Sequence, residues 1–255
     1  MKLRKSARRL VPLAAIAASG FLVAMVELDV ASQTAASGSK SDAVPEYDYE
    51  PPAPGTYELP VLQAAEDGLV IGPEGKKARL HKLLSGKVTI LSFIYTRCTD
   101  PKACLRATGV LGQLHELSRN DSSLGKDLQL ITLSFDPGYD TPDVMERYGS
   151  VFRRGEGGAE WFFLTSRSQE ELQPLLDAYG QRVEKRKKPS PLGPYQHTLR
   201  VYLIDGNKQV RNIYSYGLLD PRLVVSDART LLMERKSLSK AQGESSNVVS
   251  GTTQH

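Results

Sequence analysis

Two nearly uninterrupted apolar segments, 87–95 and 128–135, constrain the fold of this chain most strongly. Both segments are rich in β-branched and aromatic residues (KVTILSFIY and LQLITLSF). A strand of this composition is covered on both faces, which is typical of a sheet that lies between layers of helices. A shorter segment of the same kind, WFFL at 161–164, predicts a third strand.

Helical patterns separate these strands. Residues 105–117 have helical spacing, Thr141 precedes Pro142 as an N-cap precedes a first-turn proline, and Ser168 with Glu171 forms a capping box. The remaining predicted elements are strands at 57–62 and 68–72, a short helix at 80–84, a hairpin of 198–204 and 209–214, and a final helix at about 221–233. This alternation predicts an α/β fold of three layers, whose mixed central sheet is completed by a C-terminal β-hairpin and a helix.

The first thirty residues have the pattern of a targeting segment. Five basic residues lie among the first nine, and residues 10–26 then run without a charge. The segment 1–31 is therefore predicted to be either a signal peptide or an N-terminal membrane anchor, and both alternatives stay open. Basic residues remain on the cytoplasmic side, so the rest of the chain is expected to be exported, either periplasmic or anchored to the cytoplasmic membrane and facing outward.

Two polar segments flank the part of the chain that is able to form a core. Residues 32–56 are rich in Ala, Ser, Pro, Gly and acids and are predicted to be a flexible linker, while residues 236–255 are predicted to be a disordered tail. Residues 57–235 then form one domain. The net charge is only +4 and no basic stripe follows the fold, so nucleic acid is not an expected partner.

The chain contains only two cysteines, Cys98 and Cys104, and both closely follow the first buried strand. A disulfide between them would stabilise little, because the loop that it closes is very short. A reactive or metal-binding pair is therefore favoured over a structural disulfide. Helix dipoles and free amide groups stabilise a thiolate where a strand gives way to a helix, and Arg97 and Lys102 add positive charge nearby.

The strand and its cysteines resemble the Sco/SenC family. The segment SFIYTRC at 92–98 carries the resemblance, which continues in the same order with SFDP at 134–137, DTP at 140–142, YG at 148–149, HT at 197–198 and YLIDG at 202–206. It spans about residues 57–235. It implies a thioredoxin-like fold and a copper chaperone that delivers copper to an exported enzyme, such as the dinuclear copper site of a cytochrome oxidase.

The resemblance also implies the site residues. In Sco-like proteins the histidine before this late strand completes a metal site with the two cysteines, so Cys98, Cys104 and His197 are expected to hold one copper ion, Cu(I) or Cu(II). Two thiolates and an imidazole are soft ligands that suit copper, whereas zinc usually needs a fourth ligand. Asp136 also matches the family pattern, and it is expected to be either a turn former beside Pro137 or a carboxylate near the cysteine loop.

The spacing of the cysteines departs from the family pattern. Five residues, not three, separate Cys98 from Cys104, and Leu105 stands where a proline is usual. The dipeptide Asp100–Pro101 predicts that the additional residues form a turn before the helix, with Asp100 as its cap. This arrangement would still allow the two sulfurs to meet.

Other functions remain open beside copper delivery. A thiol–disulfide oxidoreductase would use Cys98 and Cys104 on the cysteines of a partner protein and would not need His197. A peroxidase and a non-catalytic adaptor with a permanent disulfide are further alternatives. The basic run 185–188 precedes His197 and is either an ordinary solvated loop or a surface that directs an acidic partner to the site.

Overall fold

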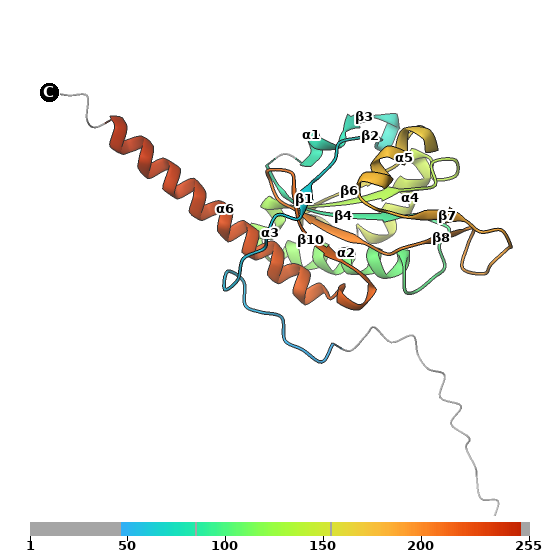
Figure 1. The fold of residues 1–255 in the computed structure, drawn as a ribbon, viewed down its shortest axis with the longest axis horizontal. Helices are drawn as coiled ribbons and strands as arrows, with labels where there is room; N and C mark the ends of the chain where they lie inside the picture. Colours follow the sequence, from blue (N-terminus) through green and yellow to red (C-terminus); the bar gives the residue numbers. More distant parts are fainter. Residues whose placement is uncertain (1–46, 85, 154, 251–255) are drawn as a thin grey trace, which may run out of the picture. The chain divides into compact units, whose positions relative to one another are not determined.

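The computed structural model describes residues 47–84, 86–153 and 155–250, and all of them belong to one compact unit. Within this part of the chain a six-stranded sheet forms the centre (Figure 1). The strands, in order across the sheet, are β1 (Gln63–Ala64), β10 (Gln209–Tyr214), β9 (Val201–Ile204), β4 (Val88–Ile94), β5 (Leu128–Ser134) and β6 (Glu160–Leu164).

The sheet is mixed, as predicted. β4 pairs with β5 and β5 with β6 in parallel, while β9 pairs antiparallel with both β4 and β10, and β1 pairs antiparallel with β10. The predicted hairpin is therefore confirmed as β9 and β10, and it lies on the far side of β4 from β5. β4 thus occupies an interior position, and the chain that leaves its carboxyl end carries the cysteines.

Helices cover both faces of the sheet, which explains the continuous apolar strands. α2 (Cys104–Arg119) and α6 (Pro221–Ser250) contact each other on one face, and α5 (Gln169–Ala178) lies on the opposite face (Figure 1). Every residue of β4 and β5 is buried. Each fully buried aliphatic side chain stabilises the fold by about 1.5–3 kcal/mol relative to an exposed one, so these strands supply much of the core.

The predicted helix caps are present. Thr141 caps α4 (Pro142–Phe152) and accepts a hydrogen bond from the Val144 amide, while Ser168 caps α5 and accepts one from the Glu171 amide.

The remaining elements are short. The helices are α1 (Leu80–Leu84), α3 (Ser122–Asp127) and the 3-10 helices η1 (Pro73–Gly75) and η2 (Tyr216–Leu218). Two small antiparallel sheets consist of β2 (Leu69–Ile71) with β3 (Lys77–Arg79) and of β7 (Val183–Lys185) with β8 (Tyr195–His197).

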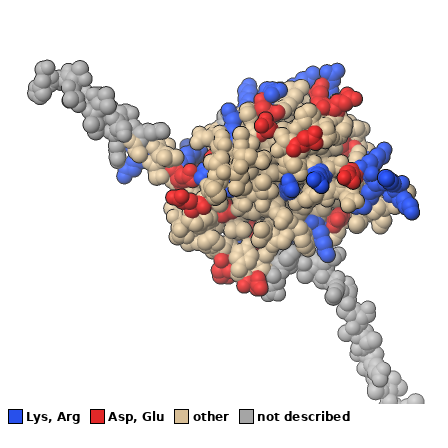
Figure 2. Space-filling model, in the orientation of Figure 1, with Lys and Arg blue, Asp and Glu red and all other residues tan. Residues whose placement is uncertain are grey.

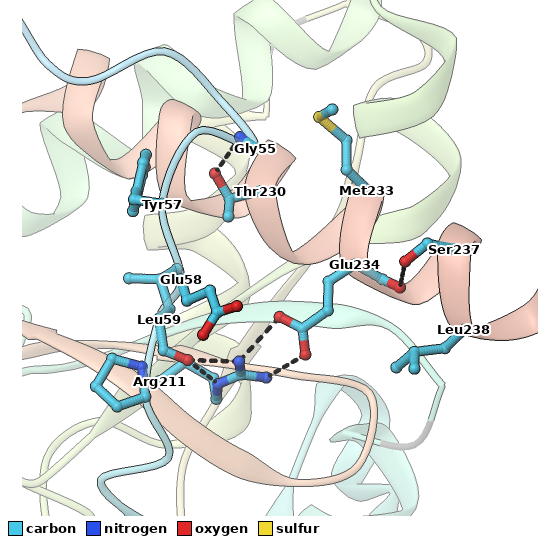
Figure 3. A pocket seen from close by; sticks show the side chains of 11 residues that line it. Gly55, Tyr57, Glu58, Leu59, Arg211, Thr230, Met233, Glu234, Ser237 and Leu238 are labelled. Atoms are coloured by element: carbon cyan, nitrogen blue, oxygen red, sulfur yellow. Dashed lines mark hydrogen bonds and ion pairs between the residues drawn. The ribbon is translucent and has the colours of Figure 1, made fainter.

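The first strand begins later than predicted. The segment 57–62 is not a strand, and pairing with β10 starts only where the Leu62 amide donates to the Val210 carbonyl, just before β1. Pro60 has no amide to donate to a ladder. The Leu59 carbonyl instead accepts hydrogen bonds from the guanidinium of Arg211 (Figure 3).

The end of the predicted flexible linker is attached to the domain. The Tyr47 hydroxyl donates to the Leu219 carbonyl at 2.7 Å, the Ser226 hydroxyl donates to the Pro52 carbonyl at 2.5 Å, and the Gly55 amide donates to the Thr230 hydroxyl at 3.0 Å (Figure 3). Residues 47–56 of the predicted linker thus contact the domain, because α6 and the Leu219 carbonyl before it offer polar partners. Residues 1–31, 32–46 and 251–255 lie outside the described residues.

The last helix is longer than predicted. The sequence pattern ended it near Met233, but α6 continues to Ser250, through much of the segment that was predicted to be a disordered tail. This segment contains no proline, and single polar or glycine residues weaken a helix without ending it. None of the helices in the described part of the chain is long and apolar enough to cross a membrane.

The packing of α4 against β6 can be tested at Gly149, with Gly109 of α2 as the control position. Gly149 is buried in α4, where a Cβ atom would collide with the ring of Phe163, whereas a Cβ on exposed Gly109 of α2 would meet no atom within 4 Å. Gly149→Ala is expected to lower the free energy of unfolding in urea by about 1–3 kcal/mol. Gly109→Ala is expected to raise it by up to ~1 kcal/mol, since alanine favours helix. Stabilisation by both substitutions would contradict the described contact.

Candidate metal centre

The two cysteines lie where the chain passes from β4 into α2. The Cys98 amide donates to the Tyr95 carbonyl at 3.2 Å, which turns the chain directly after the strand. Residues 101–103 form a further turn, and Cys104 is the first residue of α2. The predicted turn between the cysteines is confirmed. Both thiols are free, and their residues are almost fully buried, with 4% of Cys98 and 0% of Cys104 exposed.

Asp100 does not cap the helix, contrary to the prediction. Its carboxylate accepts a hydrogen bond from the Lys102 amide at 2.9 Å, within the turn itself. Ala103 occupies the N-cap position and provides no side-chain cap. The additional residues place Asp100 four positions before Cys104, which is too far along the chain for it to reach the free amides of the first helical turn.

His197 lies beside both cysteines, although it follows them by more than ninety residues. It is the last residue of β8 and pairs with Val183 of β7. Its Nε2 atom lies 3.7 Å from the Cys98 sulfur and 3.5 Å from the Cys104 sulfur. The three ligand atoms all lie within 4.8 Å of one another. The structure therefore brings together the three residues that the sequence singled out.

Aromatic side chains and a tight loop hold the imidazole in place. The rings of Tyr95 and Phe135 lie 5.7 Å and 5.1 Å from that of His197. The Tyr95 hydroxyl donates to the Leu192 carbonyl at 2.9 Å, which fixes the loop that leads into β8. Gly193 of this loop has a φ of +100°, and a Cβ atom there would collide with the Tyr95 hydroxyl. Only glycine satisfies both requirements without strain.

Asp136 links the cysteine loop to the histidine strand. Its carboxylate accepts a hydrogen bond from the Arg97 guanidinium at 2.6 Å and another from the Tyr195 hydroxyl at 3.0 Å. Arg97 precedes Cys98, and Tyr195 lies two positions before His197, so one buried carboxylate contacts the neighbours of two site residues. The side chain thus does more than form the turn beside Pro137.

Asp140 is a structural residue of the site that the sequence analysis did not predict. It is fully buried and accepts hydrogen bonds from the amide and hydroxyl of Thr96, at 3.0 Å and 2.5 Å, and from the Ser134 hydroxyl at 2.5 Å. Burial raises the pKa of its carboxyl group. Asp140 thereby anchors the start of the cysteine loop to the end of β5. The DTP motif, which begins with Asp140, was the sequence feature that could have identified this residue.

The two thiols differ strongly in acidity. A hydrogen bond from the Cys104 thiol, aided by His197 and by backbone amides and opposed by burial, lowers the pKa of Cys98 to about 4. Burial and the neighbouring Cys98 charge raise the pKa of Cys104. The Arg97 guanidinium forms its ion pair with Asp136 at 2.6 Å. At neutral pH the pair is therefore one thiolate and one thiol.

This donor set fits a soft metal ion. Two sulfurs and one imidazole nitrogen converge, and the second ring nitrogen of His197 is buried without a hydrogen-bond partner among the described residues. Thiolate and imidazole ligands suit copper, and three donors satisfy Cu(I) more readily than zinc. The sulfur pair is equally close enough for thiol exchange chemistry.

A mixed α/β sheet with two cysteines and a histidine beyond the carboxyl end of its interior strand defines a thioredoxin-like protein with a thiol–imidazole site. The family model described as SCO1/SenC matches residues 73–233, more than half of the chain. The chain therefore belongs to the SCO1/SenC family, as the sequence motifs predicted, in a form with five residues between Cys98 and Cys104. No curated protein matches the chain.

Solved structures share this fold. A SCO1/SenC family lipoprotein from Bacillus anthracis is 24% identical, with a TM-score of 0.58 over 69% of this chain and 99% of that chain. Apo Sco1 from Thermus thermophilus is 27% identical, with a TM-score of 0.55 over 69% and 95% of the two chains. Copper-bound ScoI from Arabidopsis thaliana is 22% identical, with a TM-score of 0.55 over 68% and 99%. The predicted thioredoxin-like fold is confirmed.

The difference between the two thiols can be measured by titration. On acidification of the reduced protein from about pH 7 to about pH 3, the ultraviolet absorbance of one thiolate should disappear with a midpoint near 4, because Cys98 gains its proton there. Cys98→Ser should lack this step, and Cys104→Ala should move it to higher pH, because alanine has no side-chain donor for the hydrogen bond that stabilises the Cys98 thiolate. A wild-type midpoint near the ordinary thiol value of about 8.5 would contradict the described hydrogen bonds.

Proposed function

We propose that this protein binds one copper ion through Cys98, Cys104 and His197 and delivers it to an exported copper enzyme. The convergence of two sulfurs and the His197 Nε2 atom within 4.8 Å carries this proposal. Membership of the SCO1/SenC family supports it, as does the likeness to a ScoI structure with copper bound. Copper is the cargo of this reaction, and soft sulfur ligands favour its Cu(I) form.

A cytochrome oxidase is the recipient that we propose. A similar solved structure, 22% identical with a TM-score of 0.53, is that of BsSco, described as a member of the Sco family of cytochrome c oxidase assembly proteins. Cys104 is fully buried, whereas His197 is partly exposed, so the ligands of a recipient would reach the copper from the side of His197. His197 would then be the first ligand to exchange.

An exported location accompanies this proposal. The basic residues and the uncharged segment before residue 27 support translocation of the domain, either with cleavage of the segment 1–31 or with its retention as an anchor. Delivery of copper outside the cytoplasm requires this orientation.

Thiol–disulfide exchange is a second candidate, favoured by the lowered pKa of Cys98. In this reaction the Cys98 thiolate attacks a disulfide of a partner, which breaks that bond and releases a partner thiolate. Cys104 then loses its proton, attacks the mixed disulfide and releases the second partner thiol. The partner gains two electrons and the protein acquires a Cys98–Cys104 disulfide. A reduction potential too high for the dithiol to reduce partner disulfides outside the cytoplasm would exclude it.

Copper competition tests the proposed ligand set. Reduced protein is titrated with Cu(I) against a chromophoric chelator, and His197→Ala should weaken the affinity by at least roughly tenfold, about 1.4 kcal/mol, because one of three ligands is lost. Cys104→Ser should weaken it as well. His81→Ala, a histidine that bonds the Ala65 carbonyl, should leave the affinity unchanged. Equal affinities for wild type and His197→Ala would show that the ligand set is wrong.

A further inference from the structure

A concentrated positive charge lies on the part of the chain that carries His197. Residues 182–200 contain six basic residues and a single acid, Glu184, although the net charge of the whole chain is only +4. Lysine and arginine side chains gather in Figure 2 on the side where β7 and β8 lie in Figure 1. The charge is therefore local, and the basic run 185–188 at the end of β7 is its centre.

The charges of this run are not neutralised by neighbours. The side chains of Lys185, Lys187 and Lys188 are exposed and form no ion pair within the described residues. Arg186 donates to the Tyr195 carbonyl at 3.1 Å, not to a carboxylate. An open hollow lies at this place, lined by residues 184–190 and Gln196. Such a surface presents unsatisfied ammonium groups around a concavity and is suited to carboxylates.

The basic run is attached to the cysteine loop. The Arg186 amide donates to the Pro194 carbonyl at 2.8 Å, which closes the loop 187–193 on itself. The Thr99 hydroxyl, one residue after Cys98, donates to the Pro191 carbonyl, and the Tyr95 hydroxyl donates to the Leu192 carbonyl at 2.9 Å. A molecule that binds the run would therefore lie on a loop that is bonded to the cysteine segment.

We propose that the hairpin of β7 and β8 with its basic loop is a docking arm for an acidic surface of the protein that exchanges copper with Cys98 and His197. This inference rests on the proposed function. Exchange requires the partner to bring its own metal ligands to the site, which a protein does and a lipid headgroup does not. The arm exposes one large apolar side chain, that of Leu192, which is 39% exposed. Insertion into a membrane requires a larger apolar surface. Opposite charges bring two such surfaces together and fix their orientation.

Docking can be measured without copper. The apoprotein is titrated into a fluorescein-labelled peptide of glutamates, and binding is followed by fluorescence anisotropy at low ionic strength and at about 0.5 M salt. The triple variant Lys185→Gln, Lys187→Gln and Lys188→Gln should bind at least roughly tenfold more weakly at low salt, and high salt should remove the difference. A matched variant, Lys76→Gln, Lys77→Gln and Lys82→Gln, removes three exposed lysines elsewhere and should bind as wild type does.

The rate of copper transfer to an acceptor peptide tests whether docking on the basic loop assists exchange at the copper site. Copper-loaded protein is mixed with a Cys-x-x-Cys acceptor peptide flanked by glutamates or by glutamines. The acidic acceptor should take copper at least roughly tenfold faster at low salt, and only the 185/187/188 variant should lose this advantage. If the protein holds no copper, the proposed function fails, while the anisotropy experiment still tests docking.

Three outcomes would overturn the docking arm. Equal loss of peptide binding in the two triple variants would assign the effect to net charge. Unchanged peptide binding by the 185/187/188 variant would show that the arm does not bind the acidic peptide. If that variant loses binding to phosphatidylserine vesicles but not to the acidic peptide, the basic run contacts an anionic membrane instead of a protein.

Discussion

His197 reaches the two cysteine sulfurs because the chain closes tightly between Tyr95 and Gly193. Tyr95 ends the buried β4 segment, and its hydroxyl donates to the carbonyl of Leu192, while Gly193 accepts the close approach with a positive φ. The contact joins the cysteine loop to a hairpin nearly a hundred residues later in the chain. Without it only the contacts of Thr99 and Asp136 would join the two segments, and copper would have to supply more of the ordering energy itself.

The two cysteines differ in position and in acidity. The turn at 101–103 separates Cys98 from the helix, whereas Cys104 is the first helical residue and is completely buried. A hydrogen bond from Cys104 to Cys98 then places the negative charge on the outer sulfur, next to His197. The same charge suits a metal ligand and a nucleophile, so the proposed copper delivery and the alternative of thiol exchange would use one arrangement. The buried thiol must lose its proton before it serves either reaction.

The sequence predicted those features that local patterns encode. Continuous apolar segments identified β4 and β5, capping residues identified the start of α4 and α5, and ordered motifs identified the family and the three site residues. Long-range polar contacts left no such pattern. Nothing in the local sequence shows that Asp136 contacts both Arg97 and Tyr195, or that Asp140 anchors Thr96. The short β7 and β8 strands were also missed, since three residues are too few to show a period. The attachment of residues 47–56 also depends on distant partners, mainly in α6, and no local sequence pattern predicts it.

The proposed copper site consists of one imidazole and two thiolates, from His197, Cys98 and Cys104. X-ray absorption spectroscopy of the reduced, copper-loaded protein measures the neighbours of the metal directly. We expect two sulfur neighbours and one imidazole nitrogen in the wild type, with the nitrogen contribution lost in His197→Ala and one sulfur lost in Cys104→Ser. A wild-type spectrum with sulfur neighbours alone, or one that His197→Ala leaves unchanged, would contradict it.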